Sequence, residues 1–376
     1  MSGRQIPVLD LGEDPQERGR VHGRQFADGV RHNLGVYLDR FSASGLGRGD
    51  ALAEGEAWDA AIARMAPDYA AEMRGLAEGA GLSRAELALL NARYEIAFTL
   101  FGREARKADG PAAEPDGCTT AGLLPEATAS GHTLLVQNWD WLAAIRGHCL
   151  VVRVTRSAGP SMVFFTEAGI VGGKMGLNSA GIGLVENGLA GPIDGIYPHE
   201  KPFHVRCREV LEATTLNDAM LPIVQTRRTA SANFVVGCAG GEIVDLETSP
   251  DVVAPLHPRD GIVTHSNHFL DPRHGQSQME RLSPNTLFRA ARLERLLRRH
   301  HGRLDVATIR EALSDGLSHP NAICRHPDPS QAEVRRTMTL ASVVLDLEDR
   351  VMWIAEGPCE GEHVAVPLDP RMALAA

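Results

Sequence analysis

The chain has 376 residues, 43% hydrophobic and 23% charged, a composition typical of globular proteins that excludes disorder throughout. Its formal charge of -10 gives no electrostatic footprint for nucleic acid, so we expect no nucleic-acid partner. No apolar run approaches the length of a membrane span and the first fifteen residues lack a signal-peptide pattern, so we expect no membrane association. Six cysteines without a C-x-x-C pair are too sparse for a disulfide scaffold, which favours a reducing, cytoplasmic setting.

The first 105 residues are predicted to be mostly helical. Apolar residues recur at helical spacing over 15–41, with glycine and arginine on the other face. Two more helical stretches are expected over 51–80, with an interruption at Pro67, and over 83–101, which opens with the capping-box pattern Ser83-Arg84-Ala85-Glu86. We expect this helical segment to cover another part of the fold.

The character of the sequence changes after residue 118, where short β-rich runs alternate with turns. Strands in hairpin order predict antiparallel sheets. Helices that bracket such hairpins predict two sheets packed face to face with helical layers outside. The expected strands span 132–141, 149–155, 162–167, 172–188, 233–238, 242–247, 340–347 and 350–355. The expected helices span 202–213, 284–300 and 305–314, with N-caps at Ser283 and Asp305.

The motif Asp116-Gly117-Cys118-Thr119-Thr120 follows a polar segment, 107–115, that should be exposed and tolerant of cleavage. Attack of the Cys118 thiol on the Gly117 carbonyl would cut the chain and leave a nucleophile and an amine on one residue. Glycine has no Cβ to block this attack, and an α-amine with a pKa of about 7.7–8.0 is a suitable local base. A cysteine by itself is more often a small buried apolar residue, so this motif alone leaves both interpretations open.

With its downstream motifs, the chain resembles the penicillin acyltransferase (isopenicillin N acyltransferase-like, peptidase C45) family of N-terminal-nucleophile hydrolases. The resemblance covers most of the chain. It implies an α+β fold, a four-layer αββα sandwich (the N-terminal-nucleophile hydrolase fold) with a helical N-terminal segment. The precursor would be cut into a helical α chain, 1–117, and a catalytic β chain, 118–376, that together form one globular unit. The motifs that carry the resemblance are 116–120, Gln137-Asn138-Trp139-Asp140-Trp141, 176–183, 264–269 and 319–326.

The resemblance also implies roles for individual residues. Cys118 would cut the chain and then act as the nucleophile, and Asp140 would hold its α-amine through a charge-assisted hydrogen bond. An aspartate between two tryptophans on a strand is hard to explain as a core or surface residue, which favours a function for Asp140.

Three further residues match the family's site. Asn267 matches its oxyanion-hole asparagine, although without the resemblance a turn residue after a strand is an equal interpretation. Asn187 matches a second polar contributor, although the following Gly188 favours a turn at this position. Arg336 matches an arginine near the thiol, and Arg335 stays open as the alternative because neighbouring strand residues face opposite sides.

The sequence therefore predicts a self-processing cysteine amidohydrolase or acyltransferase that needs no cofactor and no metal. It would break an amide or acyl thioester of a small molecule, with acyl-CoA as one possible donor, and pass the acyl group from Cys118 to water or an amine. Three alternatives stay open: a metal-dependent hydrolase using His265 and His268, a binding protein that is never cut, and a thioesterase-like hydrolase that needs no maturation. The histidines lie between a strand and a loop without a carboxylate or cysteine at ligand spacing, which argues against a metal.

Overall fold

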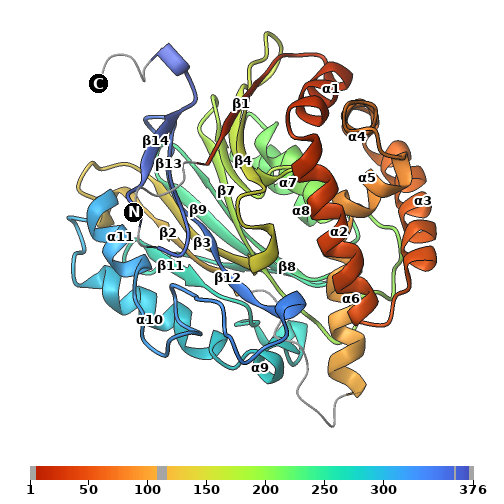
Figure 1. Ribbon diagram of the computed structural model, residues 1–376. Coiled ribbons are helices and arrows are strands. Elements are labelled where there is room, and N and C mark those ends of the chain that lie inside the picture. Colours follow the sequence, from red (N-terminus) through yellow and green to blue (C-terminus); the bar gives the residue numbers. More distant parts are fainter. Residues whose placement is uncertain (1–5, 108–116, 360, 372–376) are drawn as a thin grey trace.

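Two β-sheets pack face to face, and helices cover both outer faces (Figure 1). The structure is a computed structural model that describes residues 6–107, 117–359 and 361–371. The expected four-layer αββα sandwich is confirmed. None of the helices in these ranges is long and apolar enough to cross a membrane.

The larger sheet of the described chain has the order β1-β4-β5-β6-β7-β8-β9-β10, and the smaller has the order β11-β2-β3-β12-β13-β14. Neighbouring strands are antiparallel, as expected, except that β1 runs parallel to β4. The strands are β1 (Val8–Leu11), β2 (Thr119–Leu123), β3 (Leu134–Leu142), β4 (Cys149–Val154), β5 (Met162–Glu167), β6 (Met175–Asn178), β7 (Ile182–Gly188), β8 (Ala232–Cys238), β9 (Glu242–Thr248), β10 (Val253–Leu256), β11 (Ile262–His265), β12 (Thr337–Asp346), β13 (Val351–Glu356) and β14 (Val364–Pro367).

Helices α1 to α8 lie on the side of the larger sheet, and α10 and α11 lie on the outer face of the smaller one (Figure 1). The helices are α1 (Pro15–Gln25), α2 (Ala27–Ala43), α3 (Arg48–Met65), α4 (Pro67–Ala80), α5 (Arg84–Asn91), α6 (Arg93–Lys107), α7 (Phe203–Leu211), α8 (Leu216–Val224), α9 (Met279–Leu282), α10 (Thr286–Arg298) and α11 (Val306–Leu313).

Three of the predicted helix boundaries are confirmed, one at a proline and two at side-chain caps. Pro67 separates α3 from α4, Ser83 and Glu86 form the expected capping box, and Asp305 caps α11. The cap at Ser283 is wrong, because α10 begins at Thr286 after Asn285. Side-chain caps are local interactions, so the sequence signals them well.

Two long predicted helices are each divided. The stretch 15–41 forms α1 and α2 with a break at Phe26, and the stretch 83–101 belongs to α5 and α6 with a break at Ala92. The apolar spacing continues across both breaks, so periodicity alone does not reveal a change of direction.

The glycine face of α1 is a packing surface. A Cβ atom on Gly19 would lie 1.9 Å from the carbonyl oxygen of Glu72, and one on Gly75 would lie 1.9 Å from that of Gln16. Helices α1 and α4 therefore approach through their backbones, which only glycine permits. Arg18 is buried beside this contact in an ion pair of 2.7 Å with Glu72, so the face predicted to lie opposite the apolar one is also buried.

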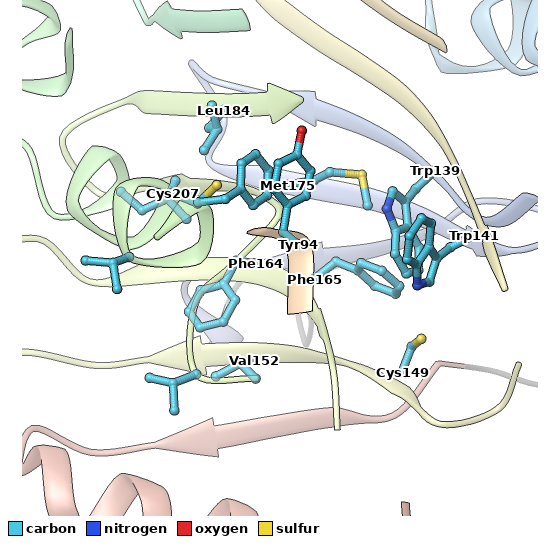
Figure 2. Close-up of a cluster of buried hydrophobic side chains, with 14 of the residues drawn as sticks. Tyr94, Trp139, Trp141, Cys149, Val152, Phe164, Phe165, Met175, Leu184 and Cys207 are labelled. Atoms are coloured by element: carbon cyan, nitrogen blue, oxygen red, sulfur yellow. The ribbon is translucent and has the colours of Figure 1, made fainter. Parts of the chain in front are cut away.

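The core between the sheets is aromatic (Figure 2). Trp139 and Trp141 of β3 extend toward the larger sheet, where the ring of Trp139 meets that of Phe165 edge-on at 5.4 Å. The amide of Gln137 bonds both the backbone N–H and the carbonyl of Glu186 on β7, at 2.9 and 2.7 Å. Since side chains alternate along a strand, Asp140 lies on the other face of β3, toward the helices over the smaller sheet.

Candidate active site

Gly117 and Cys118 lie immediately before β2, which is paired between β11 and β3 in the smaller sheet. Cys118 is fully buried. The six cysteines all lie within the described ranges, and none is in a disulfide. Asp116 and residues 108–115, the segment expected to be exposed, lie outside the described residues.

Arg289 of α10 binds the backbone on both sides of the Gly117–Cys118 bond. Its Nη1 donates to the carbonyl oxygens of Gly117 at 3.3 Å and Cys118 at 2.6 Å, and to Thr119 Oγ1 at 2.7 Å. Its Nη2 donates to Asn267 Oδ1 at 2.6 Å. The side chain is fully buried, so one guanidinium connects the peptide bond to Asn267.

Arg325 lies against Gly117 from another direction. A Cβ atom on Gly117 would lie 2.7 Å from Nη2 and 2.9 Å from Nε of Arg325. The guanidinium is held by Asp140 Oδ2, which accepts from Nε at 3.3 Å, and by Asn285 Oδ1, which accepts from Nη2 at 3.0 Å. Glycine at position 117 therefore leaves room for a buried cation beside the bond.

Asp140 completes this buried charged group. Its Oδ1 accepts a hydrogen bond of 2.6 Å from Thr339 Oγ1, the residue opposite it on β12. Burial raises the pKa of Asp140 to about 6, and the positive charges of Arg325 and Arg289 oppose this rise. The carboxylate can therefore change its protonation state near neutral pH.

The loop before α10 holds the parts of the site together. Asn285 Oδ1 accepts from both Arg289 Nε at 2.8 Å and Arg325 Nη2 at 3.0 Å. Thr286 Oγ1 accepts from the backbone N–H of Asn267 at 2.7 Å. One short segment thus fixes two guanidinium groups and the asparagine loop.

The two predicted asparagines have different partners. Asn267 Nδ2 already donates to the carbonyl oxygen of Gly188 at 2.9 Å. Asn187 Oδ1 accepts from Thr120 Oγ1 at 2.8 Å, while its buried Nδ2 has no hydrogen-bond partner among the described residues. Asn187 lies within β7, so the turn interpretation is wrong.

Arg336 lies outside these contacts. Its guanidinium donates to the carbonyl oxygens of Gln331 at 3.0 Å and Pro329 at 3.3 Å. Arg335 donates to the carbonyl of Ala43 at 3.4 Å. Among the described residues, Arg289 and Arg325 are cationic groups with contacts at the Gly117–Cys118 junction. The sequence predicted no role for either, although Arg325 lies in the 319–326 motif.

The histidines near Asn267 form hydrogen bonds within the protein. His265 Nε2 lies 2.8 Å from Glu247 Oε1, and His268 Nδ1 lies 3.1 Å from Thr286 Oγ1. Burial opposes the charged form of His265, but the carboxylates of Asp245 and Glu247 raise its pKa overall. Where the structure describes the chain, the side chains grouped closely enough to hold a metal ion are His132, Asp346 and Glu348, a set that includes neither His265 nor His268.

Comparison with known proteins identifies the family of the chain. The family model of acyl-coenzyme A:6-aminopenicillanic acid acyltransferase matches residues 127–359, a range that starts after Cys118 and includes Asp140, Asn187, Asn267, Arg289 and Arg325. The 40 kDa form of the acyl-coenzyme A:6-aminopenicillanic-acid acyltransferase of Emericella nidulans is 31% identical over 283 residues, 74% of this chain and 72% of that protein.

The solved structures that match the chain are more distant in sequence. The Caenorhabditis elegans orthologue of N-acylethanolamine-hydrolyzing acid amidase is 16% identical, over 61% of this chain and 93% of that one, with a TM-score of 0.46. A conjugated bile acid hydrolase from Clostridium perfringens is 11% identical, over 66% of this chain and 96% of that one, with a TM-score of 0.45.

The family match places the protein among the acyltransferases and amide hydrolases. The chain belongs to the acyl-coenzyme A:6-aminopenicillanic acid acyltransferase family.

Proposed function

We propose that the chain is a self-processing cysteine N-terminal-nucleophile enzyme that cuts itself between Gly117 and Cys118 and then transfers acyl groups through Cys118. One observation carries the proposal: Arg289 Nη1 donates to the carbonyl oxygen of Gly117 beside a buried cysteine. A donor at that oxygen stabilises the negative charge that develops when a nucleophile attacks the carbonyl.

Self-cleavage then takes two balanced steps. Cys118 Sγ bonds to the Gly117 carbonyl carbon, the C–N bond breaks, and the thiol proton ends on the departing nitrogen. Water hydrolyses the resulting thioester, which restores the thiol and leaves a carboxylate on Gly117. Arg289 and Arg325 lie beside the bond, and Asp140 binds Arg325, so buried charges are placed to stabilise a charged intermediate.

Acyl transfer would use the same thiol with its new α-amine as the base. The amine takes the thiol proton as Sγ attacks a substrate carbonyl, and it returns the proton to the leaving group. Asp140 would hold this amine. Among the described residues Asn187 Nδ2 has no hydrogen-bond partner, so it is the better oxyanion donor in this conformation, because Nδ2 of Asn267 is already bonded to Gly188.

The two pieces would remain one unit without a disulfide. Arg93 Nη2 of the first piece lies 2.6 Å from Glu167 Oε1 of the second, and both side chains are buried. Tyr37 donates to Glu167 Oε2 at 2.5 Å and accepts from Trp141 Nε1 at 2.5 Å. Removing one partner of a buried ion pair leaves an uncompensated charge, which strongly lowers stability. Separation of the two pieces is therefore unfavourable.

The substrate proposed is a small acyl thioester or amide, with acyl-CoA as the first donor to test, and the setting proposed is the cytoplasm. The test exposes the purified enzyme to a panel of acyl-CoA thioesters and N-acyl amides, followed by acid quench and peptide mass analysis. An acyl group on the peptide that begins at Cys118 is expected, with Cys149→Ala as a matched control that still acylates. Turnover without acylation of Cys118 would contradict the proposal.

A further inference from the structure

A cavity of about 100 Å³ lies away from the Cys118 contacts, between α3, α6 and the loop that precedes α7. Glu54, Trp58, Glu95 and Thr99 line it from the part of the chain before Gly117. His199 and Thr229 line it from the part after Cys118. A ligand in this cavity would therefore lie between the segment that precedes Gly117 and the segment that follows Cys118.

Glu95 is the unusual member of this lining. The residue is 3% exposed, and its Oε1 accepts a hydrogen bond of 2.6 Å from the backbone N–H of Phe203. Its Oε2 is buried and has no hydrogen-bond partner among the described residues. A buried carboxylate oxygen without a donor is costly, and a donor from a ligand would remove that cost.

The other walls suit a cation with a short apolar tail. Trp58 is 2% exposed, and aromatic rings attract cations. Glu54 pairs with His199 at 3.0 Å, and the described lining of this cavity contains two carboxylates and no lysine or arginine. Glu95 also lines a smaller neighbouring cavity, to which Lys201, Arg206 and Arg228 contribute. Arg206 and Arg93 lower the affinity of Glu95 for a cation by their charge, but Arg206 directs its Nη1 and Nη2 at Pro222 and at residues 226 and 227.

We propose that this cavity is a binding site for a small primary alkylammonium ion, whose N–H group donates to Glu95 Oε2. The apolar side chains of Ile96 and Leu100, which also line the cavity, provide a surface for the alkyl group. The site does not depend on the proposed chemistry of Cys118. A bound ion would stabilise the folded protein and the association of its two segments, because it binds only where both are in place.

The probe is n-propylammonium chloride, titrated into the full-length protein at constant ionic strength and followed by calorimetry and thermal melting. Saturable binding in the millimolar range is expected, as suits so small a ligand, with a rise in the melting temperature. The matched neutral probe, 1-propanol, should give no saturable binding. Equal binding of the two probes, or no saturable binding of the ammonium ion at pH 8, overturns the proposal.

The variant Glu95→Gln keeps a carbonyl oxygen for Phe203 and replaces Oε2 with an NH₂ donor. It should bind propylammonium at least tenfold more weakly, while Glu209→Gln, which removes only the carboxylate that pairs with Lys201, should bind as the wild type does. Unchanged affinity in a folded Glu95→Gln protein overturns the proposal. If that variant does not fold, the pH dependence of binding to the wild type tests the proposal. Burial raises the pKa of Glu95 to about 7, so the affinity for propylammonium should rise about tenfold from pH 6 to pH 8. An affinity that does not change with pH overturns the site.

Discussion

The guanidinium of Arg289 donates to the carbonyl oxygen of Gly117 at 3.3 Å and to that of Cys118 at 2.6 Å. A single buried cation thus spans the bond whose cleavage would create the nucleophile. Its second nitrogen donates to Asn267, the residue that resembles the family's oxyanion asparagine. The same side chain can therefore stabilise negative charge during self-cleavage and position Asn267 afterwards.

Arg289→Lys should slow self-cleavage by about 100-fold, the order of magnitude lost when one oxyanion donor is removed. Lysine keeps the charge but cannot supply the planar fork that reaches Gly117, Cys118 and Asn267 together. The measurement is the time course of the two fragments after synthesis. Arg292→Lys, three residues further along α10 and paired with Asp315 at 2.6 Å, is the control that should process normally. Equal rates in both variants would rule out a role for Arg289.

Gly117→Ala should also slow self-cleavage, by at least tenfold. The new Cβ would lie 2.7–3.0 Å from the guanidinium of Arg325, which Asp140 and Asn285 hold in place, so the guanidinium or the junction must move. Fragment formation followed by electrophoresis measures the effect. Gly35→Ala has nothing within 4 Å of its Cβ and should process like the wild type. Normal processing of Gly117→Ala would show that this close contact is unimportant.

Asn187→Ala should lower kcat by about 100- to 1000-fold with a small change in KM, because its buried Nδ2 is assigned to charge that develops only in the transition state. Steady-state kinetics on the processed variant measures this. A rise in KM with kcat unchanged would assign Asn187 to ground-state binding instead.

Asp140 should set an acid limit on activity. Burial raises its pKa to about 6, so below pH 6 it becomes protonated and can no longer accept a charge-assisted hydrogen bond from the α-amine. The profile of kcat/KM should fall as pH drops through about 6, and Asp140→Asn should lose at least 100-fold at pH 7.5 and no longer show that fall.

The control for this profile is Asp245→Asn. Burial also raises the pKa of Asp245 to about 6, but this residue lies on β9 and has no contact with Arg289 or Arg325 in the hydrogen bonds of the described chain. The acid limb should persist in Asp245→Asn. The Asp140→Asn protein should first be checked for self-cleavage. If the chain is uncut, the loss of activity would reflect failed processing and not a failed catalytic step. A limb that persists in processed Asp140→Asn would contradict the assignment.

The layers of the fold could be predicted from the sequence because hairpin turns and helix caps are local signals. The Asn178–Gly181 turn joins β6 to β7, and Gly181 has the positive φ of 85° that such turns require. The strands β1, β2, β10 and β14 were not predicted; each has four or five residues, and β1, for example, gains its place only by pairing with β4. Close contact of α1 and α4 was also invisible, since it depends on glycines 56 residues apart, Gly19 and Gly75.

Some residues of the candidate site could also be predicted from the sequence, and others could not. Cys118 is conspicuous because it follows a glycine at the end of a polar segment, and Asp140 because a carboxylate stands between two tryptophans on a predicted strand. Arg289 lies in a helix rich in arginine, so nothing local distinguishes it from a solvated charge. Arg325 lies in the 319–326 motif, but the motif alone predicted no role for this side chain. The available signal is the polar run Ser283-Pro284-Asn285-Thr286. It predicts a helix start, and its side chains also bind both arginines and the backbone N–H of Asn267.

The central claim is the cut between Gly117 and Cys118, and the intact mass of the purified protein tests it most directly. The wild type should give two masses, for residues 1–117 and 118–376, that co-purify under native conditions. Cys118→Ala should give one chain of 40.5 kDa. A wild-type enzyme that is fully active as a single uncut chain, or a Cys118→Ala protein that is still cut at Gly117, would contradict the account.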